Sequence, residues 1–207
     1  MTGQVASMSG IWRPLLALIL ASLVVMGSPG PSTLSVTAAG AAFGFRRSLG
    51  YASGLIVGTV GVLLAVALGV VAFLFSVPHG VHVLTRLASA YLLYLAFKIA
   101  TAPPLQSLGG DRQPPAFLGG FLLAIANPKA YLAIAAVFSG TTLVDDQMMN
   151  ALVKIALLAG MIVIIHLAWL LAGVALSHVL QAPLPSRLVN LALSAILAAI
   201  AVTGFVG

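Results

Sequence analysis

The sequence predicts an all-α integral membrane protein whose six transmembrane helices form two inverted three-helix repeats, with helices 1 and 4 broken by proline motifs. The 207 residues are 61% hydrophobic and only 6% charged, whereas soluble domains carry about 25% charged residues. Several apolar stretches reach the roughly 20 residues needed to cross a bilayer. Two of these stretches carry prolines at corresponding positions. We therefore expect one transmembrane domain over residues 1–207, with halves at about 11–101 and 114–207.

The apolar stretches are separated by segments that contain charge, proline or glycine. In chain order they cover about residues 14–45, 50–76, 83–100, 116–140, 151–176 and 188–206. The first stretch also has features of a secretory signal peptide, because Arg13 precedes its apolar run. Since apolar residues resume after the SPGP at 28–31, we expect this segment to be retained as the first helix.

Charge in the connections predicts the orientation in the membrane, because Lys and Arg favour the cytoplasmic side. With the N-terminus outside, five basic residues fall inside and three fall outside. The inner set is Arg46, Arg47, Lys98, Arg112 and Arg187, and the outer set is Arg13, Arg86 and Lys154.

The two interruptions repeat with nearly the same spacing. Pro29 lies 21 residues before Gly50, where the second stretch opens, and Pro128 lies 22 residues before Asn150. Three helices in each half force the second half to insert upside down, and paired broken helices point to a transporter's binding site. Prolines also kink many helices without any ligand nearby, so this plainer interpretation stays open.

A broken helix exposes backbone groups that could bind a zwitterion. Helix starts near Pro31 and Pro128 would offer amides and partial positive charge to a carboxylate. The preceding half-helices would offer carbonyl groups to an ammonium group. We therefore expect the substrate site at the two breaks, formed by Pro29, Gly30, Pro31, Asn127, Pro128 and Lys129.

The motifs around the breaks resemble the lysine-exporter and homoserine/threonine-resistance (LysE/RhtB-type) family of amino-acid efflux proteins. The resemblance covers essentially the whole chain. Its motifs are PGP at 29–31, FRRSLGYASGLIVGTVG at 45–61 and FLGGFLLAIANPKA at 117–130. It implies a six-helix exporter in the bacterial cytoplasmic (inner) membrane, which moves amino acids outward using the proton motive force.

Two titratable side chains are expected at mid-membrane depth, where such groups are costly and usually functional. Lys129 would hold the substrate carboxylate or, alternatively, donate to carbonyls freed by a break. His166 is a candidate proton relay, or else a neutral ring bonded to a neighbouring carbonyl. Asn127 could bond either the unwound backbone or the substrate.

Glycines at mainly four-residue spacing allow close approach of helix backbones. They are Gly40, Gly44, Gly50, Gly54, Gly58 and Gly61. Their use would be packing within one chain or, alternatively, a homodimer interface.

The sequence also argues against several classes of protein. It has no cysteine, and its three carboxylates, Asp111, Asp145 and Asp146, fall in connections. This argues against metal sites, thiol redox chemistry and aspartyl proteases. We expect no cofactor and no nucleic-acid partner, since the net charge of +6 is typical of basic cytoplasmic loops.

These patterns predict a proton-coupled secondary exporter of small neutral amino acids or close derivatives that alternates access around a mid-membrane site. An efflux protein or channel for another small solute on the same scaffold is the alternative. A membrane-embedded enzyme or assembly factor that uses Lys129 and His166 is a third interpretation. The expected partners are an amino-acid substrate and the lipid bilayer.

Overall fold

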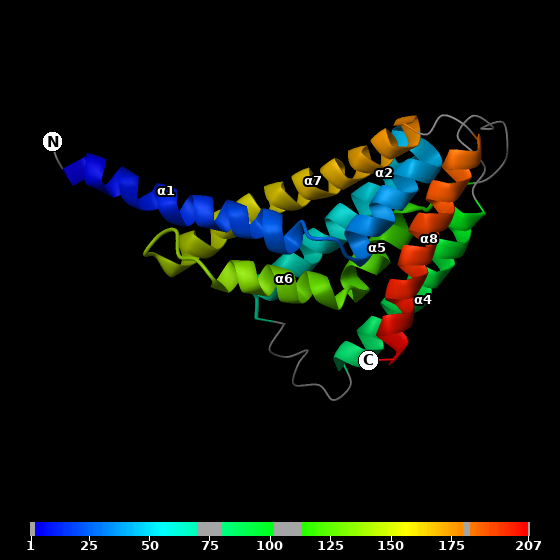
Figure 1. Ribbon diagram of the computed structural model, residues 1–207. Coiled ribbons are helices and arrows are strands. Elements are labelled where there is room, and N and C mark those ends of the chain that lie inside the picture. The colour runs from blue at the N-terminus through cyan, green and yellow to red at the C-terminus, as the bar shows by residue number, and fades with distance from the viewer. Residues whose placement is uncertain (1–2, 70–79, 102–112, 180–182, 207) are drawn as a thin grey trace.

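The structure, a computed structural model, describes residues 3–69, 80–101, 113–179 and 183–206, and these are helical with no strand. The prediction of an all-α protein is therefore confirmed for this part of the chain (Figure 1). The elements are α1 (Gly3–Ala21), the π-helical turn η1 (Ser22–Met26), α2 (Pro31–Ala67), α4 (Gly80–Ala100), α5 (Phe117–Ala126), α6 (Pro128–Ser139), α7 (Gln147–Val179) and α8 (Pro183–Val206).

Two of the described helices are long and apolar enough to cross a membrane, namely α2 and α7 over Gln147–Leu176. The pair α5 and α6, bent by 63°, makes a third if it forms one span. The six-span inverted repeat thus stays a prediction. The predicted end of the second stretch and the connection that holds Asp111 lie outside the described residues.

The first interruption separates η1 from α2. Gly30 is extended, with φ −174° and ψ −176°, and Pro31 begins α2. Proline suits this first helical position, because its missing N–H would have no partner there in any case. Inside α2 only Gly44 departs from helical geometry, with φ 76° and ψ 174°. The sequence predicts a connection between the first two apolar stretches. In the structure the helix is interrupted there at Gly44 alone, and Arg46 and Arg47 lie on the helix.

The second interruption is one residue long. Asn127 is extended, with φ −81° and ψ 102°, between the end of α5 and Pro128 at the start of α6. Its side-chain Oδ1 accepts a hydrogen bond of 3.1 Å from the backbone N–H of Lys129, which caps the new helix. The NPK sequence thus ends one helix and starts the next.

Helix α2 packs against both α7 and α5, while α4 runs beside α8 (Figure 1). Glycine permits the close contact between α2 and α5, because a Cβ at Gly54 would collide with the carbonyl oxygen of Phe117. A Cβ at Gly58 would lie 2.7 Å from the carbonyl oxygen of Phe121. These two glycines serve packing within the chain, whereas a Cβ at Gly50 would meet nothing within 4 Å.

Two buried apolar clusters flank a polar layer. Along α2, Leu55 belongs to one cluster and Val62 to the other, and the buried Thr59 lies between them. Along α7, Leu170 and Ile162 belong to these same two clusters. The buried His166 lies between them in the same way. The two clusters therefore enclose a narrow zone of polar side chains, and both helix breaks lead into it.

Candidate functional site

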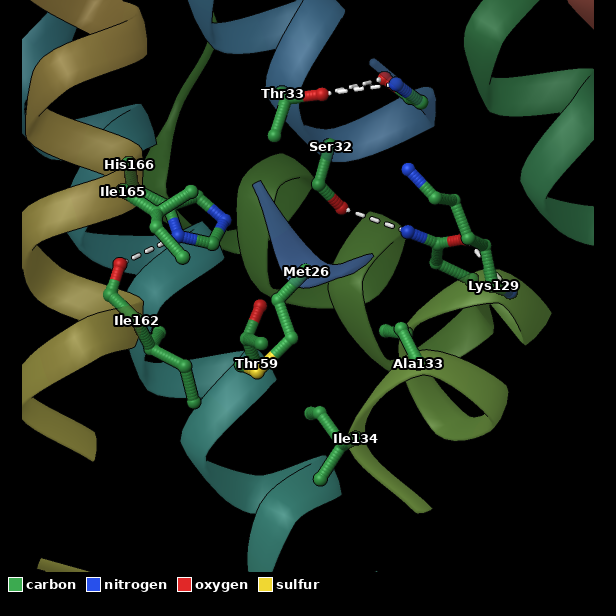
Figure 2. Close-up of a pocket in the computed structure, with 13 residues that line it drawn as sticks. Met26, Ser32, Thr33, Thr59, Lys129, Ala133, Ile134, Ile162, Ile165 and His166 are labelled. Atoms are coloured by element: carbon green, nitrogen blue, oxygen red, sulfur yellow. Dashed lines mark hydrogen bonds between the residues drawn. The ribbon is translucent and has the colours of Figure 1, made fainter. Parts of the chain in front are cut away.

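A cavity lies between the two helix breaks and α7 (Figure 2). Its space is about 430 Å³, including the part open to the outside. The residues that line it come from η1, both breaks, α2, α6 and α7. They are Met26, Gly30, Ser32, Thr33, Thr59, Asn127, Lys129, Ala130, Ala133, Ile134, Ile162, Ile165 and His166.

The backbone carbonyls of the first break all receive hydrogen bonds from within the fold. Trp169 Nε1 on α7 donates to the carbonyl of Gly27 over 3.0 Å. Lys129 Nζ donates to the carbonyls of Ser28 and Pro29 over 2.6 and 2.9 Å. The carbonyl of Gly30 accepts from the N–H of Leu34 over 2.9 Å. Unpaired carbonyls at membrane depth would be costly, so this set of donors stabilises the break.

Lys129 therefore joins the two breaks, because its own backbone belongs to the start of α6 and its ammonium group lies at the first break. An ammonium group has three donors, and the carbonyls of Ser28 and Pro29 use two of them. The side chain lines the cavity. The third N–H has no acceptor within the described residues, and its use by a substrate anion stays a prediction.

Asn127 and Ser32 make a second link between the breaks. Asn127 is only 4% exposed, and its Nδ2 donates to Ser32 Oγ over 2.9 Å (Figure 2). Since its Oδ1 caps α6, each end of this side chain is already engaged. Asn127 therefore holds the two helix starts in a fixed relation.

His166 enters the cavity from α7. Its side chain is 4% exposed, and its Nδ1 lies 2.8 Å from the carbonyl oxygen of Ile162, one turn earlier. Its other ring nitrogen, Nε2, is buried and has no partner among the described residues. The ring is thus fixed at one nitrogen and free at the other.

Among the described residues, those that line the cavity include the Lys129 ammonium group and no carboxylate. The described acids, Asp145 and Asp146, are exposed in the segment before α7, where Asp146 Oδ1 accepts from the N–H of Met149 over 2.7 Å. Hydroxyl groups of Ser32, Thr33 and Thr59 add neutral polarity to the cavity wall. Such a site can hold a small molecule that carries a carboxylate and is otherwise neutral, or a small zwitterion.

Comparison with known proteins identifies the family. Residues 22–206 match the family described as LysE type translocator, which covers both breaks and every residue that lines the cavity. The chain belongs to the LysE type translocator family. It is accordingly a membrane translocator and not an enzyme, and the resemblance recognised in its motifs is confirmed.

Two relatives of this translocator are named as efflux proteins. The cysteine/O-acetylserine efflux protein of Salmonella typhimurium is 31% identical over 155 residues, which are 73% of this chain and 78% of that protein. The protein of the same name from Escherichia coli K12 is 30% identical over 155 residues, with the same coverage. No solved structure matches the translocator significantly.

The predicted site residues divide into two groups. Gly30, Asn127, Lys129 and His166 line the cavity, although they come from the two breaks and α7. Pro29, Pro31 and Pro128 do not line it; they shape the breaks, and Pro29 also supplies a carbonyl to Lys129. The structure thus brings the two groups into one region, and their roles toward a substrate stay predictions.

Sequence reasoning missed several residues of this region. Ser32 and Thr33 follow the PGP motif directly, and hydroxyl side chains next to a helix break were a signal in the sequence. The structure buries both. Trp169 was not among the predicted site residues, yet its Nε1 donates to the carbonyl of Gly27 at the first break. A search for N–H donors deep in the spans, opposite the freed carbonyls, would have selected Trp169, three residues after His166.

Proposed function

We propose that this translocator exports small neutral amino acids or close derivatives from the bacterial cytoplasm, with cysteine and O-acetylserine as the first candidates. The observation that carries the proposal is the cavity between the two broken helices. It offers the Lys129 ammonium group to a carboxylate, and none of the described residues that line it is an acid that would favour a cationic substrate. The names of the relatives support the choice of the two candidates.

The transport cycle that we propose is alternating access coupled to protons. Two inverted three-helix halves in the inner membrane would rock around the breaks, so that a substrate at Lys129 faces one side and then the other. His166 would load and release the proton. A homodimer remains compatible with this scheme, but Gly54 and Gly58 already serve packing within the chain.

The test is efflux of amino acids from cells preloaded with dipeptides, with all released amino acids measured at once. We expect cysteine, O-acetylserine or another small neutral amino acid to leave faster with the intact chain than with an empty vector. The rate should saturate as the internal concentration rises. A response from no amino acid, with the protein present in the membrane, would contradict the proposed substrate class. Flux that does not saturate would favour a channel.

Gly30→Ala gives a local test of the site. A Cβ at Gly30 would lie 2.7 Å from both Cδ and Nζ of Lys129, while the extended backbone at this position accepts any residue. We expect the variant to fold but to displace the ammonium group, and so to lower the initial export rate by about tenfold. The control is Gly160→Ala on α7, where a Cβ meets nothing within 4 Å. Equal export by both variants would show that the position of Lys129 does not matter.

A further inference from the structure

His166 Nε2 is a buried nitrogen without a hydrogen-bond partner among the described residues. Buried polar atoms almost always have a hydrogen-bond partner, so each exception needs an explanation. Within the described part of the chain, buried side-chain atoms without a partner are Tyr51 Oη, Thr141 Oγ1 and His166 Nε2. Of these three residues, His166 is the one that lines the cavity. Its free nitrogen is therefore placed to meet whatever the cavity binds.

The hydrogen bond at His166 Nδ1 determines whether Nε2 carries a proton in the neutral ring. A carbonyl oxygen can only accept, so the 2.8 Å contact with Ile162 requires the proton to be on Nδ1. In the neutral ring Nε2 then carries a lone pair and no proton. Figure 2 shows Nε2 turned away from Ile162, toward the middle of the cavity and the side where Ser32 and Lys129 lie. His166 thus presents a buried acceptor.

Among the described residues, the side-chain oxygens that line the cavity already take part in hydrogen bonds within the fold. Within the described residues no carboxylate lines the cavity, and the first-break carbonyls from Gly27 to Gly30 each already accept a hydrogen bond. The hydroxyl of Thr59 donates to the carbonyl of Leu55 over 2.7 Å, so its oxygen can still accept. His166 Nε2 differs from it in having no hydrogen-bond partner at all within the described residues. The ammonium group of an amino acid whose carboxylate lies at Lys129 still needs an acceptor wherever the cavity shields it from water.

We infer that His166 Nε2 accepts a hydrogen bond from the α-ammonium group of an amino acid whose carboxylate lies at Lys129. The inference rests on the proposed function. It gives the bound substrate an orientation, with the carboxylate toward the breaks and the ammonium group toward α7. His166 is then a binding residue and not a proton relay alone.

A proton bound to Nε2 would remove this acceptor. Apart from His166, the titratable side chain lining the cavity within the described residues is Lys129, which is held at the carbonyls of Ser28 and Pro29. Proton and ammonium group would thus compete for one atom of His166. Such competition is what an exchanger of substrate and proton requires.

The experiment compares two ligands on purified protein in detergent, where no gradient exists. L-Cysteine and 3-mercaptopropionate share the thiol and the carboxylate, but only cysteine has the amino group. Wild-type protein should bind cysteine about 10–100-fold more tightly, the usual effect of a hydrogen bond to a charged group. His166→Asn keeps an N–H near the Ile162 carbonyl and has no acceptor at the place of Nε2. We expect it to bind both ligands about equally.

His166→Gln is the matched rescue, because its longer side chain can bring an amide oxygen near the place of Nε2. It should recover part of the preference for cysteine, whereas a merely structural role would weaken both ligands alike in every variant. Should His166→Asn not fold, the glutamine variant carries the test in its place. A folded asparagine variant that keeps the full preference for cysteine would overturn the inference and leave the proposed function standing. If wild-type protein binds no small neutral amino acid, including cysteine and O-acetylserine, the proposed substrate class fails, and the inference fails with it.

Discussion

Lys129→Ala is expected to abolish export while the protein remains in the membrane. The substitution removes the ammonium group that faces the cavity and, with it, the proposed partner of the substrate carboxylate. Truncating one member of a buried charge pair costs several kcal/mol, so export should fall by about 100-fold or more. The measurement is the initial export rate of the responding amino acid, divided by the amount of translocator in the membrane.

The same variant also leaves the carbonyls of Ser28 and Pro29 without the Lys129 donor. Pro29 is exposed and the Ser28 carbonyl keeps a second donor, Thr33 Oγ1 at 3.4 Å, so the loss of thermal stability should be smaller than the roughly 1–3 kcal/mol of a fully buried unsatisfied acceptor. Lys154→Ala separates the two effects. Lys154 is 6% exposed, and its Nζ likewise donates to two backbone carbonyls, those of Phe138 and Thr141, away from the cavity.

We expect Lys154→Ala to lower stability but to keep most of the export per molecule. Lys129→Arg should retain donors for the carbonyls and lose less stability than the alanine variant. Near-normal export by Lys129→Ala would rule out the role in carboxylate binding. Lys129 would then act by stabilising the broken helix alone.

Gly54→Ala is expected to disrupt the packing of α2 against α5. The added methyl group would collide with the backbone carbonyl of Phe117, and a backbone atom cannot turn aside as a side chain can. Overpacking of this kind costs about 1–3 kcal/mol or more. The thermal midpoint of the purified protein should therefore fall by several degrees, and export should fall with it because α5 leads into the second break.

The matched control is Gly50→Ala, one turn earlier on the same helix, where a Cβ meets nothing within 4 Å. Alanine is favoured over glycine within a helix by about 0.5–1 kcal/mol, so this variant should be neutral or slightly more stable. A folded Gly50→Ala variant that loses export and self-association would instead indicate a homodimer interface. Equal stability of the two variants would contradict the packing described for Gly54.

The breaks were predictable because proline acts on its own backbone. Pro31 and Pro128 cannot donate a hydrogen bond, and each begins a helix in the structure. The depth of Lys129 in an apolar stretch likewise follows from counting residues. The region after Gly44 was predicted less well. Its charged residues predicted a connection between two helices, whereas in the structure the chain departs from helical geometry only at Gly44, which has positive φ.

The sequence by itself determined the helical membrane class, the family and the positions of the two interruptions, because hydrophobic length and proline chemistry are local properties. Tertiary structure alone decided which groups meet across the chain. Lys129 donates to carbonyls about 100 positions earlier, Trp169 donates to Gly27, and His166 turns its free nitrogen into the cavity. These pairings depend on how α2, α6 and α7 pack together, and the spacing of residues along one helix carries no information about the partner on another.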